Sequence, residues 1–336
     1  MNSPQRPFFK GIPRFVAATD ELEVSEAAES VYRWWWECLR LSPVLWFAAE
    51  TGFPPKEAEV AKVAEAFGDL RSGNFTKWWR ETGRKIFAES KRPSRVTLLD
   101  LSQLNRHRFS ADKIYIEVPL TIRQQTIVRQ FKGILAARHD GRELDLLKHS
   151  NAEFKLYTKR YNNELHPLIN EYWVLLYRLL HPRIEIWRIG DRLQVAPQHQ
   201  IRDAYGNIAD PDLYGRYRPN RHLNGLTSMT GRYLYKARFA LLNAERGSFP
   251  NHTAVAVSER YQPFGLKHQT EFRHATEDGK DGSESAWKNW LRRKYAAELR
   301  NEVARRNHIK DKFEMADGKV RRRMDPFIAG ESDLLL

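Results

Sequence analysis

The chain of 336 residues is 41% hydrophobic and 12% aromatic, which is typical of a folded protein and excludes an intrinsically disordered one. Its 56 Lys and Arg residues outnumber 42 Asp and Glu residues, and the formal net charge of +14 favours a polyanionic partner, nucleic acid before membrane. The single cysteine, Cys38, excludes an internal disulfide framework and every cysteine-rich zinc site.

The first predicted unit is a multi-helix, tryptophan-rich domain over residues 20–92. Apolar residues recur at three- and four-residue spacing over residues 22–50, which indicates helix. Pro43 is expected to open a second helix there, with Ser42 as its cap. Another helix is expected over residues 56–67.

Three consecutive tryptophans, Trp34, Trp35 and Trp36, lie inside the first of these helices. Successive helical residues point about 100° apart, so the three rings cannot share one face. We therefore interpret the triplet as the hub of a helical core, with at most one indole reaching solvent, and not as an exposed stacking platform.

An α-rich central domain with a small β element is predicted over residues 93–250. Short β-branched runs at residues 95–99 and 114–118 indicate strands. Three helices are expected after them: one opened by a capping box at residues 121–124, one over residues 163–181 and one over residues 226–245.

The C-terminal part is predicted to contain a linker over residues 251–285 and a basic helix and tail over residues 286–323. Thirteen basic and six acidic residues lie between residues 283 and 323. The helix carries an apolar stripe at four-residue spacing, formed by Trp287, Leu291, Tyr295, Leu299 and Val303. The expected fold class is therefore mainly α, with a multi-helix N-terminal domain, an α-rich central domain and a long basic C-terminal helix.

Residues 186–201 are the first candidate recognition element. Apolar residues, a small residue at Gly190 and a polar second half nearly match a helix-turn-helix, in which the second helix enters the major groove. The usual turn glycine is replaced by Gln194. A β-hairpin is the alternative, because Gly190-Asp191 is also a two-residue turn signature. The side chains that would contact nucleic acid are Arg188, Arg192 and Gln198.

Further candidate nucleic-acid contacts are Lys and Arg residues. Some of them alternate with tyrosines along the sequence, and others lie near the C-terminus. Guanidinium groups neutralise phosphates and aromatic rings stack on unpaired bases, although the same pattern also fits a solvated face over an aromatic core. The residues predicted to bind nucleic acid are Arg216, Arg218, Arg232, Lys236, Arg238, Arg292, Arg293, Lys294, Arg321, Arg322 and Arg323.

No catalytic signature is found. Glu153 has the spacing of the last part of a metal-dependent nuclease motif, with Asp140 or Asp145 upstream, but the segment does not look like the strands that such a motif requires. The histidines lack ligand spacing with carboxylates. We therefore predict no catalytic residues, no metal site and no cofactor, and an enzyme is the less favoured reading.

Several short motifs together suggest a family setting: Tyr32-x-Trp34-Trp35-Trp36, Phe67-Gly68-Asp69, Val118-Pro119-Leu120-Thr121, Trp187-x-Ile189-Gly190, Gly231-Arg232-Tyr233-Leu234 and Gly247-Ser248-Phe249-Pro250. In this combination, roughly residues 30–250 resemble uncharacterised bacterial proteins found with prophages and integrative elements. The resemblance implies a mobile-element setting in which a DNA-facing role is expected, and it assigns no role to any residue.

The sequence thus predicts a non-enzymatic nucleic-acid-binding protein, with DNA favoured over RNA. One alternative is an interaction or oligomerisation module, in which the stripe of the C-terminal helix docks on a partner helix or a second copy. A metal-dependent nuclease is the third hypothesis. No run of 18 apolar residues and no apolar signal core is present, so we expect a cytoplasmic protein without a membrane partner.

Overall fold

The protein is mainly helical in a computed structural model that describes residues 8–10, 12, 19–89, 116, 118–138, 150–158, 165–199, 220–256, 264 and 282–315. The N-terminal helices are α1 (Asp20–Ala28), α2 (Val31–Arg40), α3 (Pro43–Thr51), α4 (Ala58–Phe67), α5 (Phe75–Trp78) and α6 (Arg84–Phe87), with a 3-10 turn η1 (Leu70–Ser72) and a π turn η2 (Trp79–Gly83). The remaining elements are α8 (Gln124–Arg138), α9 (His166–Leu180), α10 (Ile186–Arg192), η3 (Pro197–His199), α11 (Asn220–Ala244) and α13 (Glu284–Met315).

Local signals explain the start and end of the early helices. The hydroxyl of Ser30 accepts a hydrogen bond from the backbone N–H of Tyr32 and thereby caps α2. Ser42 caps α3 in the same way and Pro43 is its first residue, as predicted. Gly52 ends α3 in the left-handed region, at a φ of 79° that most other residues avoid.

The tryptophan triplet is a core hub, as predicted. Trp35 and Trp36 are 0% and 1% exposed, and Trp34 is half-buried. The ring of Trp35 lies 5.5 Å from that of Phe249 and 6.1 Å from that of Phe154, centroid to centroid. The hub therefore joins α2 to segments more than a hundred residues further along the chain.

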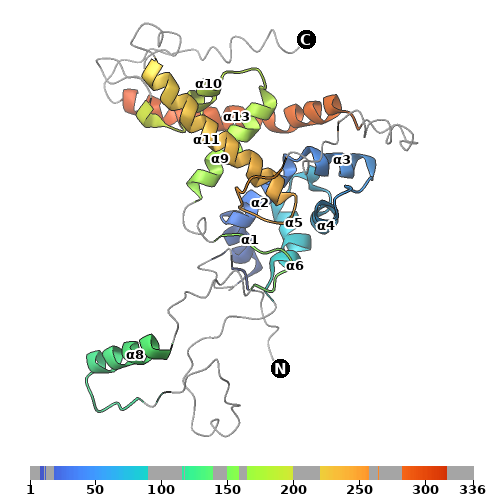
Figure 1. The fold of residues 1–336 in the computed structure, drawn as a ribbon. Helices are drawn as coiled ribbons and strands as arrows, with labels where there is room; N and C mark the ends of the chain where they lie inside the picture. The colour runs from blue at the N-terminus through green and yellow to red at the C-terminus, as the bar shows by residue number, and fades with distance from the viewer. Residues whose placement is uncertain are drawn as a thin grey trace.

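The N-terminal helices and the later helices share one hydrophobic cluster, which runs from Phe9 to Val303. Helix α11 packs on α9, α10 and α2, and α13 packs on α9 and α3. Figure 1 shows α11 extending from the α10 end of the molecule down to α2, with α13 crossing beside α9. The cluster crosses the predicted boundary at residue 92, and the division into domains stays a prediction.

Among the described residues no strand is present, only two isolated bridges, one between Phe8 and Glu89 and one between Leu156 and Phe249. The predicted strand at residues 95–99 lies outside the described residues, and of residues 114–118 only 116 and 118 are described. In residues 151–157 buried side chains alternate with exposed ones, but several of these residues form bends. The small β element is therefore not confirmed.

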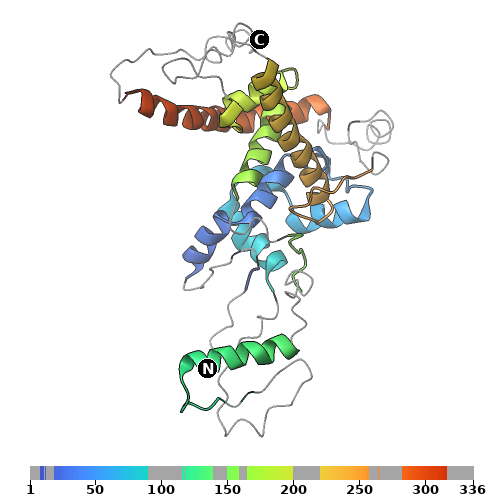
Figure 2. The ribbon, with the colours of Figure 1, turned by 60° about the vertical axis from the view of Figure 1, so that its left-hand side comes forward.

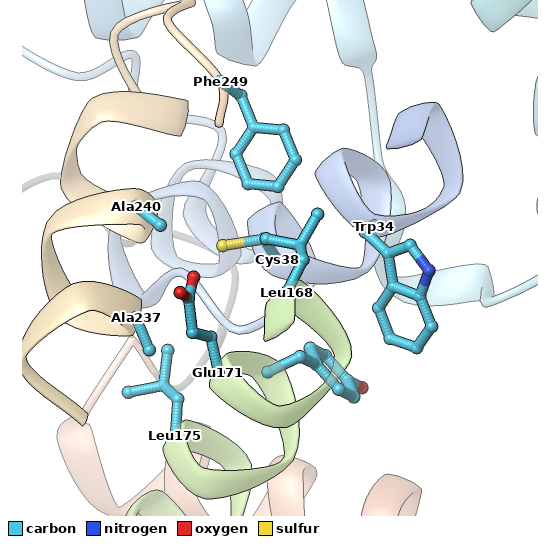
Figure 3. Close-up of a pocket in the computed structure, with 9 residues that line it drawn as sticks. Trp34, Cys38, Leu168, Glu171, Leu175, Ala237, Ala240 and Phe249 are labelled. Atoms are coloured by element: carbon cyan, nitrogen blue, oxygen red, sulfur yellow. The ribbon is translucent and has the colours of Figure 1, made fainter. Parts of the chain in front are cut away.

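Helix α8 lies apart from the other described helices in two views that differ by 60° (Figures 1 and 2), and none of its residues is buried. A cavity about the size of one water molecule lies where α2, α9 and α11 meet, and residues that include Cys38 and Glu171 line it (Figure 3). No helix in the described part of the chain is long and apolar enough to cross a membrane.

Candidate nucleic-acid interface

Helix α11 is positioned by a buried stripe along one side. Leu226, Thr230, Leu234, Ala237 and Leu241 recur every three or four residues and are all buried. The same 25 residues contain four Lys and Arg residues and no Asp or Glu. The side of the helix opposite the stripe is therefore basic, without an acidic side chain of its own.

This opposite side, called here the α11 face, is solvent-exposed. Its members are exposed residues that share one side of the helix: Asn224, Thr227, Ser228, Arg232, Tyr235 and Arg238. Of the three α11 residues predicted to bind nucleic acid, Arg232 and Arg238 lie on this face, whereas Lys236 is half-buried at its edge. Tyr235, which we did not predict, lies between the two arginines with 57% of its surface exposed.

The recognition element predicted over residues 186–201 is formed only in its first half. Residues 186–192 are the helix α10, so the hairpin alternative is wrong. Gln194 has a φ of 52° and so takes the left-handed conformation of the turn glycine that it replaces. The predicted second helix does not follow within the described chain: residues 197–199 form a 3-10 turn, and residues 200 and 201 lie outside it.

Gly190 occupies a helix crossing, as the motif requires, but the crossing partner is α11. A Cβ at Gly190 would overlap the hydroxyl of Thr230, which lies in the buried stripe. Helix α10 therefore packs closely against α11. Two residues of α10 that we predicted to contact nucleic acid interact with other side chains of the protein. Arg188 pairs with Glu185 at 3.0 Å and lies over the ring of Trp187. Arg192 donates a hydrogen bond to the hydroxyl of Tyr177 at 2.6 Å. Gln198 is exposed.

Cations of α13 lie on the outside of that helix. Arg292, Arg293 and Lys294 are exposed, while Trp287, Leu291, Tyr295, Leu299 and Val303 are buried. The stripe that suggested a partner helix thus packs on helices of the same chain, and its burial accounts for its apolar character without a partner.

Arg192 of α10 and Arg292 of α13 both act on His181, which follows the last residue of α9. Burial, together with the positive charges of Arg192 and Arg292, lowers the pKa of His181 to about 4. Both arginines were predicted to bind nucleic acid, and the fold brings them from two separate helices to the surroundings of one neutral histidine.

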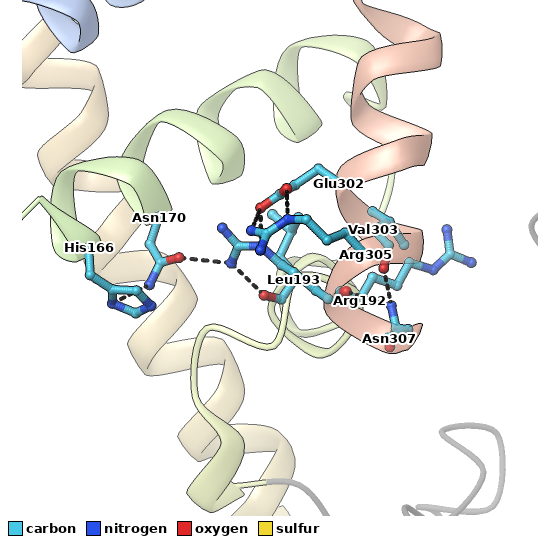
Figure 4. A network of polar contacts seen from close by, with 9 residues as sticks. His166, Asn170, Arg192, Leu193, Glu302, Val303, Arg305 and Asn307 are labelled. Atoms are coloured by element: carbon cyan, nitrogen blue, oxygen red, sulfur yellow. Dashed lines mark hydrogen bonds and ion pairs between the residues drawn. The ribbon is translucent and has the colours of Figure 1, made fainter. Parts of the chain in front are cut away.

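A polar network fixes the C-terminal part of α13 against α9 and the α10 turn (Figure 4). One guanidinium nitrogen of Arg306 donates to the side-chain oxygen of Asn170 at 2.8 Å and to the carbonyl of Leu193 at 2.7 Å, and its Nε donates to Glu302 at 2.6 Å. The amide of Asn307 donates to the carbonyl of Arg192 at 3.1 Å. The exposed cations of α13 are therefore held on a fixed helix.

The cavity beside Cys38 brings a thiol and a carboxylate close together. Figure 3 shows Cys38 and Glu171 directed into the space between α2, α9 and α11. Burial raises the pKa of the Cys38 thiol well above its usual value, and the negative charges of Glu245 and Glu171 raise it further. A thiol in this state is protonated and unreactive at neutral pH. Glu171 accepts a hydrogen bond from, or pairs with, His252 at 2.8 Å.

The nuclease hypothesis gains no support from the described residues. Glu153 is exposed in a bend, and Asp140 and Asp145 lie outside the part of the chain that the structure describes. Within that part, no group of three or more His, Cys, Asp or Glu side chains is placed to hold a metal ion.

Five predicted contact residues, namely Arg216, Arg218, Arg321, Arg322 and Arg323, also lie outside the described residues. Comparison with known proteins adds no family: no family model, curated protein or solved structure matches this chain.

Proposed function

We propose that this protein binds nucleic acid through basic helical surfaces and catalyses no reaction. The observation that carries the proposal is the α11 face, which combines two exposed arginines and an exposed tyrosine on a helix with no acidic residue. Arginine neutralises phosphate groups, and an exposed ring offers a stacking surface to bases. The exposed cations Arg292, Arg293 and Lys294 of α13 add to the same attraction.

The preference for DNA over RNA rests on the resemblance to prophage-associated bacterial proteins and is proposed on that ground alone. The incomplete motif at residues 186–199 provides no described recognition helix for the major groove. Affinity should therefore come mainly from phosphate contacts, which act without regard to sequence and weaken as salt rises.

The experiment is a fluorescence-anisotropy titration of labelled DNA and RNA oligonucleotides at about 50 and about 200 mM salt. The test variant, Arg232→Gln/Arg238→Gln, removes two charges from the α11 face. The control variant, Lys77→Gln/Arg80→Gln, removes two exposed charges from the α5 and η2 region.

We expect wild-type affinity to fall steeply with salt. In the test variant, affinity at low salt should drop and the slope of log affinity against log salt should flatten by about 1.4 to 1.8. The control variant should retain most of the wild-type slope. Absence of binding at low salt, or an equal loss in both variants, would contradict the proposal.

A further inference from the structure

Tyr235 stands out among the aromatic residues of the fold because most of them are buried. Its exposed fraction of 57% contrasts with rings such as Trp35 and Tyr177, which are fully buried. The ring is nevertheless held in place, since it makes a T-shaped contact with the buried Phe239, with centroids 4.7 Å apart and planes at 64°. An exposed ring with a fixed orientation is suited to receive a flat ligand.

The space beside this ring is left open by Gly231. Gly231 lies four residues before Tyr235, about one turn away on the same side of the helix. A Cβ built on Gly231 would meet no described atom within 4 Å. Glycine destabilises a helix interior relative to alanine, and no packing contact among the described atoms requires it here.

Charge and hydrogen-bonding groups flank the open space. Arg232 and Arg238 lie three residues before and three residues after Tyr235, about one helical turn to either side. Ser228 and Asn224 continue the same face toward the start of the helix with small polar side chains. A chain that passes along the face can thus place phosphates near both arginines while one base covers the ring.

Resting on the nucleic-acid function proposed above, we infer that the α11 face binds single-stranded nucleic acid, with one unpaired base stacked on Tyr235 beside Gly231. Bases within a duplex already stack on their neighbours, so their faces are closed to Tyr235. An unpaired base has a free face, and this contact tolerates any of the bases because each has a π-face.

The test compares one labelled oligonucleotide as a single strand and as a blunt duplex, in anisotropy titrations at low salt. Tyr235→Ala is expected to weaken single-strand binding at least about fivefold while changing duplex binding by less than about twofold. Tyr235→Phe keeps the ring and should bind like wild type. Tyr157→Ala is the matched control, because Tyr157 is also 57% exposed but lies on the segment before α9.

A second variant tests the open space without removing the ring. Gly231→Leu places a good helix former beside Tyr235, so single-strand affinity should fall as in Tyr235→Ala while the thermal unfolding midpoint does not decrease. Gly133→Leu in α8, where a Cβ also meets nothing within 4 Å, should leave affinity unchanged.

The outcomes separate the two proposals. If wild type binds neither form at low salt, both proposals are wrong. If wild type binds, but Tyr235→Ala weakens the binding of single strand and duplex equally or weakens neither, the stacking site is overturned. The proposed nucleic-acid function would still stand.

Discussion

Glu245 is a buried carboxyl group whose charge should make stability depend on pH. It accepts a hydrogen bond at 2.5 Å from the hydroxyl of Ser42, the residue that caps α3. Burial raises its pKa to about 7, against the lowering effects of Ser42 and Arg246. Between the ordinary glutamate pKa and 7 the folded state binds more protons than the unfolded state, so the free energy of unfolding should decrease as pH rises across this window.

We expect wild type to lose a few kcal/mol of unfolding free energy between about pH 5 and pH 8 from this group, since each unit of pKa difference corresponds to about 1.4 kcal/mol. Glu245→Gln keeps the acceptor for Ser42 and removes the ionisation, so it should unfold with a flatter pH dependence and be the more stable protein at pH 8. Urea unfolding at several pH values measures this. The exposed Glu81→Gln serves as control, and an unchanged slope in Glu245→Gln would contradict the assignment.

Individual residues were predictable where local geometry decides their position. The tryptophan triplet was correctly read as a core hub because a helix must spread three consecutive rings over different faces. Tyr235 was missed for the opposite reason. Whether Tyr233 or Tyr235 faces solvent depends on the rotation of α11, which is set by its contacts with α9 and α10. Spacing alone could have shown only that Tyr235 shares a side with Arg232 and Arg238.

At the scale of elements, docking of α13 should depend on Arg306 more than on its neighbour Arg305. Arg306 is 11% exposed at its side chain and satisfies both Asn170 and the carbonyl of Leu193. Arg306→Ala would leave these buried acceptors without that donor, at a cost of about 2 to 3 kcal/mol in unfolding free energy. Chemical denaturation followed by circular dichroism measures this loss.

Arg305→Ala is a closely matched control. Arg305 pairs with the same carboxylate, Glu302, but its side chain is 63% exposed. Exposed ion pairs contribute less than about 1 kcal/mol, so this variant should unfold close to wild type. Equal destabilisation by the two substitutions would show that the network of Arg306 does not hold α13 in place.

Elements were predicted well in type and less well in their partners. The four-residue stripe from Trp287 to Val303 gave the correct buried side of α13, because that periodicity belongs to the helix alone. What the stripe contacts is a property of the whole chain, and α9 and α3 proved to be the partners. Similarly, the sequence Gly190-Asp191 alone is compatible with a hairpin turn. In the structure, Gly190 lies where a side chain would overlap Thr230, and this close approach is the reason that a glycine is needed there.

At the scale of the whole molecule, α13 contributes both basic charge and part of the common core. We therefore expect that basic residues can be removed without loss of stability only after the end of α13. A chain that ends at residue 282 loses five buried apolar side chains of α13 and uncovers the surfaces of α9 and α3 on which they pack. Since each buried large apolar side chain contributes roughly 1.5 to 3 kcal/mol, the loss is comparable with the total stability of a typical domain. This chain should unfold without a cooperative transition.

A chain that ends at Met315 keeps the entire described core, which reaches only to Val303, and lacks Arg321, Arg322 and Arg323. It should unfold at the wild-type midpoint in a thermal scan. If the three arginines contact phosphates, its slope of log affinity against log salt should also be flatter by about 2 for a single strand. A cooperative, wild-type-like transition in the chain that ends at residue 282 would instead show that the rest of the protein folds without α13. An unchanged salt slope in the longer chain would limit phosphate contacts to the folded helices.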